Sequence, residues 1–187
     1  MAMGNFLTQD RFETEEKFNQ VLNYLSDKTS SWIESHGARL KIEGLWLEQK
    51  PNASAGQNYG YNGRVWSVSI NGGLARNKAV TTDGFVMVFC HELGHHLGGF
   101  PFFNDTVIAG MAVEGEADYY SASCVKNIWR EEHTLNSQSI HFVSNKDMET
   151  CDVQRSDILD RELCYRVMNA IRSREALYKY YEDQSPG

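Results

Sequence analysis

The sequence predicts an α+β fold in the order helix, short sheet and then three helices. Three observations lead to this order. Residues 10–35 repeat apolar side chains at helical spacing, and Gly37 follows as a stop signal. Residues 65–70 alternate apolar and polar side chains, which is typical of a half-buried strand. Beyond residue 83, three further segments return to helical spacing.

The composition limits the classes of function. The 187 residues suffice for one domain, with an N-terminal helix in 1–38, a core part in 39–130 and a helical part in 131–187. The net charge of -7 argues against nucleic acid as a partner. No apolar run approaches the roughly 18 residues of a membrane helix, so we expect no membrane span. The sequence does not specify an oligomeric state.

The sheet is expected to follow the first helix. Residues 40–42 and 45–47 have strand composition on either side of Gly44. Residues 51–63 are rich in Asn, Ser, Gly and Tyr, which is typical of a turn or a long hairpin loop. The strand over 65–70 is then closed by a glycine turn at 71–73.

The first helix after the sheet has recognisable ends. Asp83 is the expected N-cap of a helix over residues 84–97. The Gly-Gly-Phe-Pro segment at 98–101 terminates it, because glycine favours helix ends and proline cannot continue a helix.

Two more helices are expected downstream. Asp105 or Thr106 would cap a helix that runs to residue 130. Residues 133–150 are polar and expected to be irregular, and a last helix covers residues 152–181.

The four cysteines contain no CxxC pair, which argues against a cysteine zinc site or a thioredoxin-like motif. Two disulfides and free buried cysteines both fit this even count. Cys151 and Cys164, the nearest in sequence, are the first candidates for a bridge, and Cys90 and Cys124 would then be core residues. Disulfides favour a secreted or periplasmic location, although the chain starts without a signal peptide; a cytoplasmic location is the alternative.

The segment His91-Glu92-Leu93-Gly94-His95 has the spacing of a metal site. Helix residues four apart share a face, so both imidazoles can reach one zinc ion. Glu92 lies about 100° around the helix from His91, which suits a general base for a metal-activated water. His96 points elsewhere, as a surface residue or a partner of the ligands. The same pattern also arises by chance in unrelated helices.

A third ligand must come from elsewhere in the chain. In the arrangement HExxHxxGxxH the third histidine position holds Pro101 here, and proline has no ligand atom. Glu114 and Asp118 are four apart and share a helix face, so Glu114 is the first candidate, with Asp118 accepting a hydrogen bond from a ligand histidine. Glu116, about 200° from Glu114, is the alternative ligand. If these carboxylates have no function, they simply form an acidic, solvated face of a helix.

The HELGH segment together with Glu114-Gly115-Glu116-Ala117-Asp118 resembles the gluzincin zinc peptidases, and most closely the HtpX and CaaX-prenyl-protease family with its HExxH and ExxAD motifs. The resemblance covers residues 65–125. It implies a zincin-like fold with a small antiparallel sheet packed on the active-site helix. It also implies one zinc ion per chain, bound by His91, His95 and Glu114. The interval of 19 residues between His95 and Glu114 is short for the HtpX-like family and closer to that of thermolysin-like gluzincins. The sequence also lacks the membrane helices of HtpX-like enzymes. By this resemblance we expect a soluble, minimal gluzincin.

Gluzincins place a sheet edge beside the cleft, where an extended peptide adds as a strand. By this likeness the substrate-binding candidates are Val68, Ser69, Ile70, Asn71 and Gly72, although an ordinary hairpin strand explains them equally well. Hydrolysis also needs a donor to the oxyanion. His141 is the first candidate for that donor, ahead of Tyr119, Tyr120, His133 and Arg166.

The sequence therefore predicts a zinc metalloendopeptidase that cleaves a peptide or protein substrate with Glu92 as general base. The alternative is a catalytically inactive, zinc-stabilised module that binds a peptide or partner. A helical scaffold without metal is the third interpretation.

Overall fold

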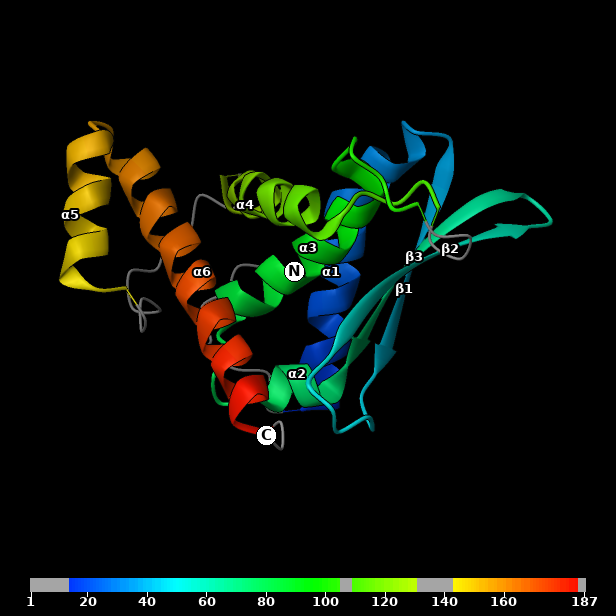
Figure 1. The fold of residues 1–187 in the computed structure, drawn as a ribbon, viewed down its shortest axis with the longest axis horizontal. Helices are drawn as coiled ribbons and strands as arrows, with labels where there is room; N and C mark the ends of the chain where they lie inside the picture. Colours follow the sequence, from blue (N-terminus) through cyan, green and yellow to red (C-terminus); the bar gives the residue numbers. More distant parts are fainter. Residues whose placement is uncertain (1–13, 105–108, 131–142, 185–187) are drawn as a thin grey trace.

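A computed structural model describes residues 14–104, 109–130 and 143–184, and these form an α+β fold (Figure 1). The described residues contain six helices and one three-stranded mixed sheet. The elements are α1 (Glu15–Glu34), β1 (Ala38–Leu45), β2 (Ala53–Gly60), β3 (Gly63–Asn71), α2 (Gly72–Arg76), α3 (Thr82–Leu97), α4 (Glu114–Arg130), α5 (Asn145–Gln154) and α6 (Ile158–Gln184). Within the described ranges, none of the helices has an apolar stretch long enough to span a bilayer.

The sheet is mixed, so the expectation of an antiparallel sheet is wrong in part. Its strand order is β1-β3-β2, in which β1 runs parallel and β2 antiparallel to β3. Helix α1 packs on β1 and contributes Phe18, Val21, Leu25 and Ile33 to the core. The predicted first helix is thus confirmed from residue 15 onward.

The loop expected over 51–63 is wrong, because β2 occupies residues 53–60. This strand has no buried residue, so its sequence lacks the apolar alternation that marks a strand. Backbone pairing with β3 is what holds it extended. The glycine turn expected at 71–73 is also wrong, since α2 begins at Gly72, and β1 continues through Gly44 to end at Leu45.

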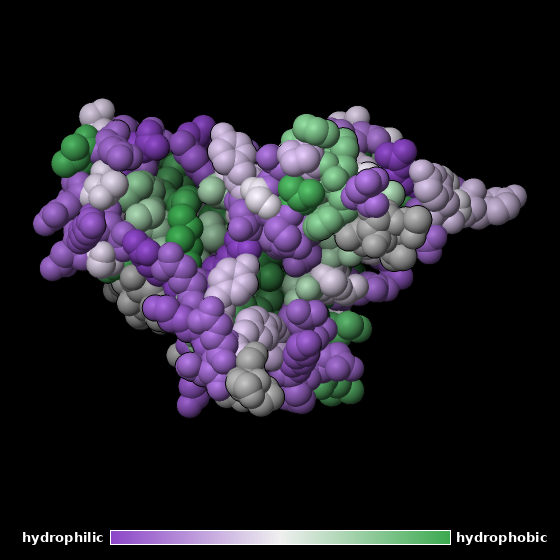
Figure 2. All heavy atoms as spheres, viewed as in Figure 1, coloured by the Kyte–Doolittle hydropathy of each residue, from purple (hydrophilic) through white to green (hydrophobic). Residues whose placement is uncertain are grey.

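The β2–β3 hairpin extends away from the rest of the chain (Figure 1) and forms a narrow projection in the space-filling view (Figure 2). Tyr59 and Tyr61 are exposed near its tip. The opposite end of the hairpin lies against α3, so β2 reaches from solvent to the central helix.

Helix α3 is the centre of the fold and is confirmed over residues 82–97. It packs against α4, α6 and both strands of the hairpin, which explains why most of its residues are buried. Its N-cap is Thr81, whose hydroxyl accepts from the Gly84 N–H at 3.0 Å, and not Asp83. The Asp83 carboxylate is buried instead in an ion pair with Arg166 of α6, at 2.6 Å.

Helix α4 starts later than expected. Asp105 and Thr106 lie outside the described residues, but residues 109–113 are described and are not helical. A short antiparallel bridge joins Phe102 to Ala112, and the Ala112 N–H donates to the His95 carbonyl at 2.7 Å. These contacts hold the chain extended until it enters α4 at Glu114, directly over the end of α3.

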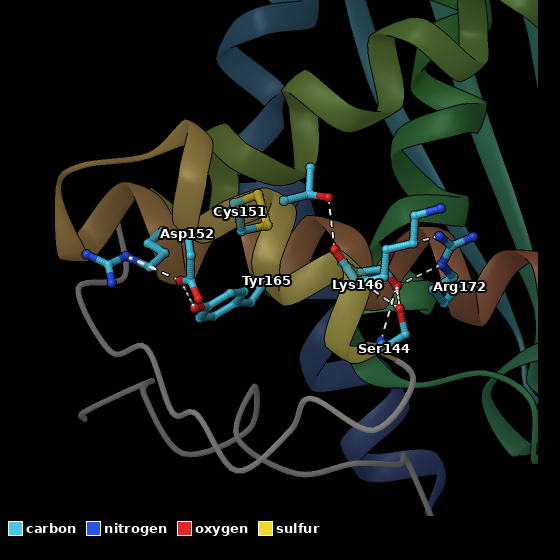
Figure 3. Close-up of a disulfide and its surroundings, with 10 residues drawn as sticks. Ser144, Lys146, Cys151, Asp152, Tyr165 and Arg172 are labelled. Carbon is cyan, nitrogen blue, oxygen red and sulfur yellow. Dashed lines mark hydrogen bonds and ion pairs between the residues drawn. A yellow bond between two sulfur atoms is a disulfide. The ribbon is translucent and has the colours of Figure 1, made fainter.

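The C-terminal region forms two helices, so the single helix expected over 152–181 is wrong, as is irregular chain from residue 145 onward. Ser144 and Asp147 form a capping box at the start of α5. The predicted Cys151–Cys164 bridge is confirmed and joins α5 to α6 (Figure 3). Arg172 of α6 binds the Asp147 carboxylate at 2.7 Å and adds a second link between the two helices.

The other two cysteines were expected to be core residues, and both are buried. They are not free, however, because Cys90 of α3 and Cys124 of α4 form a second disulfide. All four cysteines of the chain are therefore bonded.

Candidate metal centre

Three metal-binding side chains meet where α3 and the start of α4 cross. The imidazole Nε2 of His91 lies 3.1 Å from one carboxylate oxygen of Glu114, and Nε2 of His95 lies 3.7 Å from the other. One ligand atom from each of the three residues lies within 4.8 Å of the other two. Both histidines are buried, whereas the Glu114 side chain is 69% exposed, so the centre opens toward solvent.

The second nitrogen of each imidazole has its own partner. Nδ1 of His95 lies 2.8 Å from the Ala112 carbonyl, which can only accept, so this nitrogen carries the proton. Nδ1 of His91 lies 2.7 Å from the Asp118 carboxylate, a shorter contact than the 3.2 Å to the Arg174 guanidinium, and this favours the proton on Nδ1 there too. Both Nε2 atoms therefore present lone pairs toward Glu114. Two neutral imidazoles and one carboxylate are a donor set that fits zinc.

Electrostatics favour neutral His91. Burial lowers its pKa, and the neighbouring Arg174 guanidinium lowers it further. A neutral imidazole is the form that binds a metal ion.

Close packing brings the two helices together. A Cβ atom built on Gly94 would lie 2.7 Å from both the Cα and the carbonyl oxygen of Ala117. Only glycine permits this contact, because the atoms it faces belong to the backbone of α4. Ala117 sits between Glu114 and Asp118 in the sequence, so the contact sets how close both carboxylates come to α3.

Glu92 lies beside the three ligands but is not one of them. Its side chain is buried, and the Ala55 backbone N–H of β2 faces its carboxylate, which opposes part of the rise in the pKa of Glu92. In the metal-free protein, burial raises the pKa of Glu92 to about 7. The carboxyl group thus lies next to the metal-binding residues and to the edge of β2 that no other described strand pairs with.

Arg174 of α6 belongs to the site and was missed by the sequence analysis. Its guanidinium forms an ion pair with Asp118 and lies 3.2 Å from Nδ1 of His91. It also donates to the hydroxyl of Tyr178, one turn further along α6. No signal in the sequence marks these two residues, because α6 reaches the site only through tertiary packing.

A pocket of about 110 Å³ lies next to this group, between β2, α3 and α6. His91, Glu92 and Arg174 are among its lining residues. The remaining wall is mostly apolar and includes Ala53, Leu74, Val88, Leu177, Tyr178 and Tyr181.

Several expected site residues lie elsewhere. Glu116 is not part of the ligand cluster. His96 packs its ring on Trp66 at 5.0 Å, and its Nε2 lies 3.2 Å from the Ser67 carbonyl, so it binds the sheet. The segment Val68, Ser69, Ile70, Asn71 and Gly72 cannot be a free edge, because β3 is paired on both sides and Gly72 begins α2.

The expected oxyanion donors either lie outside the described residues or do not line the pocket beside Glu92. His141 and His133 lie outside the described residues. Arg166 is buried against Asp83. Tyr119 is exposed and Tyr120 is half-buried, and neither lines the pocket beside Glu92.

Comparisons with known proteins add no relative. No protein-family model matches the chain, and neither a curated protein nor a solved structure matches it. The functional interpretation therefore depends on the residues of the site and their geometry.

Proposed function

We propose that this protein is a zinc-dependent metalloendopeptidase of the gluzincin type, with a zincin-like arrangement of a sheet edge beside helix α3. The observation that carries the proposal is the meeting of His91, His95 and Glu114 beside the buried carboxylate of Glu92. A chance HExxH sequence gives no reason for a glutamate from a second helix to lie at the same point.

Each residue has a defined task in hydrolysis. A zinc ion held by His91, His95 and Glu114 would supply a Lewis acid that activates water near neutral pH and polarises a peptide carbonyl. Glu92 accepts the proton of the attacking water and passes it to the leaving amine. Asp118 keeps the proton of His91 on Nδ1, which leaves Nε2 free as a ligand.

The outer edge of β2 is the proposed binding edge for an extended peptide, in place of the 68–72 segment. Among the described strands, β2 pairs with β3 alone, which leaves its second edge unpaired. The N–H of Ala55 points from this edge to Glu92, and the N–H and C=O of a strand residue face the same side. The Ala55 carbonyl is therefore available to a substrate N–H within reach of the base.

Tyr178 is the proposed donor to the developing oxyanion, in place of His141. A guanidinium can only donate, so in its contact with Arg174 the Tyr178 oxygen accepts and its own O–H remains able to donate. Tyr178 lines the same pocket as His91 and Glu92. Tyr178→Phe is expected to lower kcat by about 10²- to 10³-fold without loss of zinc. An unchanged kcat would remove Tyr178 from the mechanism.

The two disulfides support an oxidising, extracellular or periplasmic location. A zinc-stabilised module that binds peptides without cutting them is the alternative function. Glu92 favours the enzyme, because a module that only binds peptides needs no carboxylate base beside its metal ligands.

The test is a peptide-library digest with zinc-loaded protein, Glu92→Gln and Glu116→Gln. Glu92→Gln should keep its zinc and lose at least about 100-fold in rate, because it lacks the base. Glu116→Gln is the matched control on α4 and should retain both properties. Equal cleavage by wild type and Glu92→Gln would refute the mechanism, and tight zinc without cleavage by any form would favour the binding module.

A further inference from the structure

The Cys90–Cys124 disulfide joins the two helices that divide the metal ligands between them. Cys90 directly precedes His91 on α3, and Cys124 lies six residues after Asp118 on α4. Their Cα atoms are 5.7 Å apart, and both side chains are buried. The covalent bond therefore lies within two helical turns of residues from both halves of the site.

The ligand that most needs such support is Glu114. It is the first residue of α4, and its side-chain contacts among the described residues are with His91 and His95. Before a metal binds, the position of its carboxylate therefore depends on where the backbone of α4 lies. Among the described residues, no hydrogen bond or ion pair joins the Glu114 side chain to another residue of α4.

Two of the contacts between α4 and α3 lie closest to the ligands along the helices. The first is the backbone contact of Ala117 with Gly94, and the second is the bond from Cys124 to Cys90. These points are seven residues apart on α4, or about 10 Å along the helix. Without the bond, the second half of α4 would be held on α3 mainly by apolar packing, which is less directional than a covalent link.

We propose that the Cys90–Cys124 disulfide is a positioning element of the metal centre, which raises zinc affinity by holding Glu114 and Asp118 in register with the histidines. The inference rests on the proposed metal site but not on peptidase activity. Ligands held close to their bound geometry lose less freedom on binding, so affinity is greater. The site would then be tight only where the bond can form, in an oxidising compartment.

The second disulfide provides a matched control within the same chain. Cys151–Cys164 also joins two helices, but α5 and the adjoining part of α6 carry no ligand of the centre. Both disulfides should stabilise the fold, because each closes a loop in the unfolded chain. Only the first should affect the metal.

The experiment measures zinc affinity by competition with a chromophoric chelator. We expect Cys90→Ala/Cys124→Ala to bind zinc about 10- to 100-fold more weakly than wild type, by analogy with the loss of other groups that orient ligands. Cys151→Ala/Cys164→Ala should stay within about threefold. Cys90→Val/Cys124→Ala, which refills core volume without a bond, keeps the test available if the first variant does not fold.

Equal affinity in wild type and the Cys90/Cys124 variants would overturn the inference, and so would equal losses in both pairs of variants. Wild type that binds no zinc would overturn this inference together with the proposed function. A selective loss of affinity in a protein that cleaves no peptide would support the positioning role and reject the peptidase.

Discussion

Replacing Gly94 with alanine places a methyl group between the two helices that carry the metal site. The new carbon would lie 2.7 Å from the Cα and from the carbonyl oxygen of Ala117. Non-bonded carbon atoms prefer about 3.5–4.0 Å, so α4 must retreat by roughly 1 Å at this point. Glu114 and Asp118 flank Ala117 and must retreat with it.

The two effects of this substitution have different sizes. Overpacking costs about 1–3 kcal/mol, and the greater helix propensity of alanine returns about 1 kcal/mol, so the metal-free protein should lose only about 1 kcal/mol. Zinc–ligand distances tolerate about 0.2 Å. A shift of roughly 1 Å in Glu114 should therefore weaken zinc binding by at least about tenfold, comparable to the loss of a group that orients a ligand.

The assay combines thermal unfolding of the metal-free protein with a zinc titration against a chromophoric chelator. Gly115→Ala is the matched control, because a Cβ atom there would meet nothing within 4 Å. The control should bind zinc as wild type does. If Gly94→Ala binds zinc as tightly as Gly115→Ala, the approach of α4 to α3 does not set the geometry of the site, and the reasoning fails.

Three further predictions concern metal removal, a buried ion pair and acid stability. Removing zinc with a chelator should lower the unfolding temperature, since zinc present at 100 times its Kd stabilises by about 2.7 kcal/mol; an unchanged temperature in calorimetry would contradict a structural grip on the metal. Asp83→Ala should cost about 3–5 kcal/mol in denaturant unfolding, because it leaves the buried Arg166 unpaired, and a cost below about 1 kcal/mol would show that the pair contributes little. Hydrogen bonds from Arg172 hold the pKa of Asp147 well below its ordinary value of 3.8, so its stabilisation is complete above that pH and is lost as pH falls toward the lower folded-state pKa. Asp147→Asn should therefore flatten the acid limb of the stability curve, and an unaltered limb would exclude this pair as its source.

Local patterns allowed helix α3 and five residues of the candidate site (His91, Glu92, His95, Glu114 and Asp118) to be predicted from the sequence. The two histidines of HExxH are four residues apart, so they share a face of any regular helix, whatever the rest of the fold. Glu114 and Asp118 followed from the same four-residue rule, and the structure brings both to the histidines. Whether they bind zinc is a prediction that awaits a metal measurement.

The errors occur where long-range contacts decide the local structure. Asp83 has the composition of an N-cap, but its partner Arg166 is 83 residues away, and Thr81 takes the capping role. Strand β2 exists through pairing with β3 and not through its own apolar pattern. Arg174 was missed, and the Cys90–Cys124 bond was left open, for the same reason, since each depends on how separate helices pack.

The connection from α3 to α4 contains Phe100, which is 82% exposed. A cut there would divide the protein into two chains, one holding His91 and His95 and the other Glu114. Because Cys90 and Cys124 lie on opposite sides of the cut, the two pieces would remain one molecule until reduced. On a gel, such a clipped protein would migrate as an intact chain without reductant and as two fragments with it, and its metal-binding groups would come from two separate polypeptides.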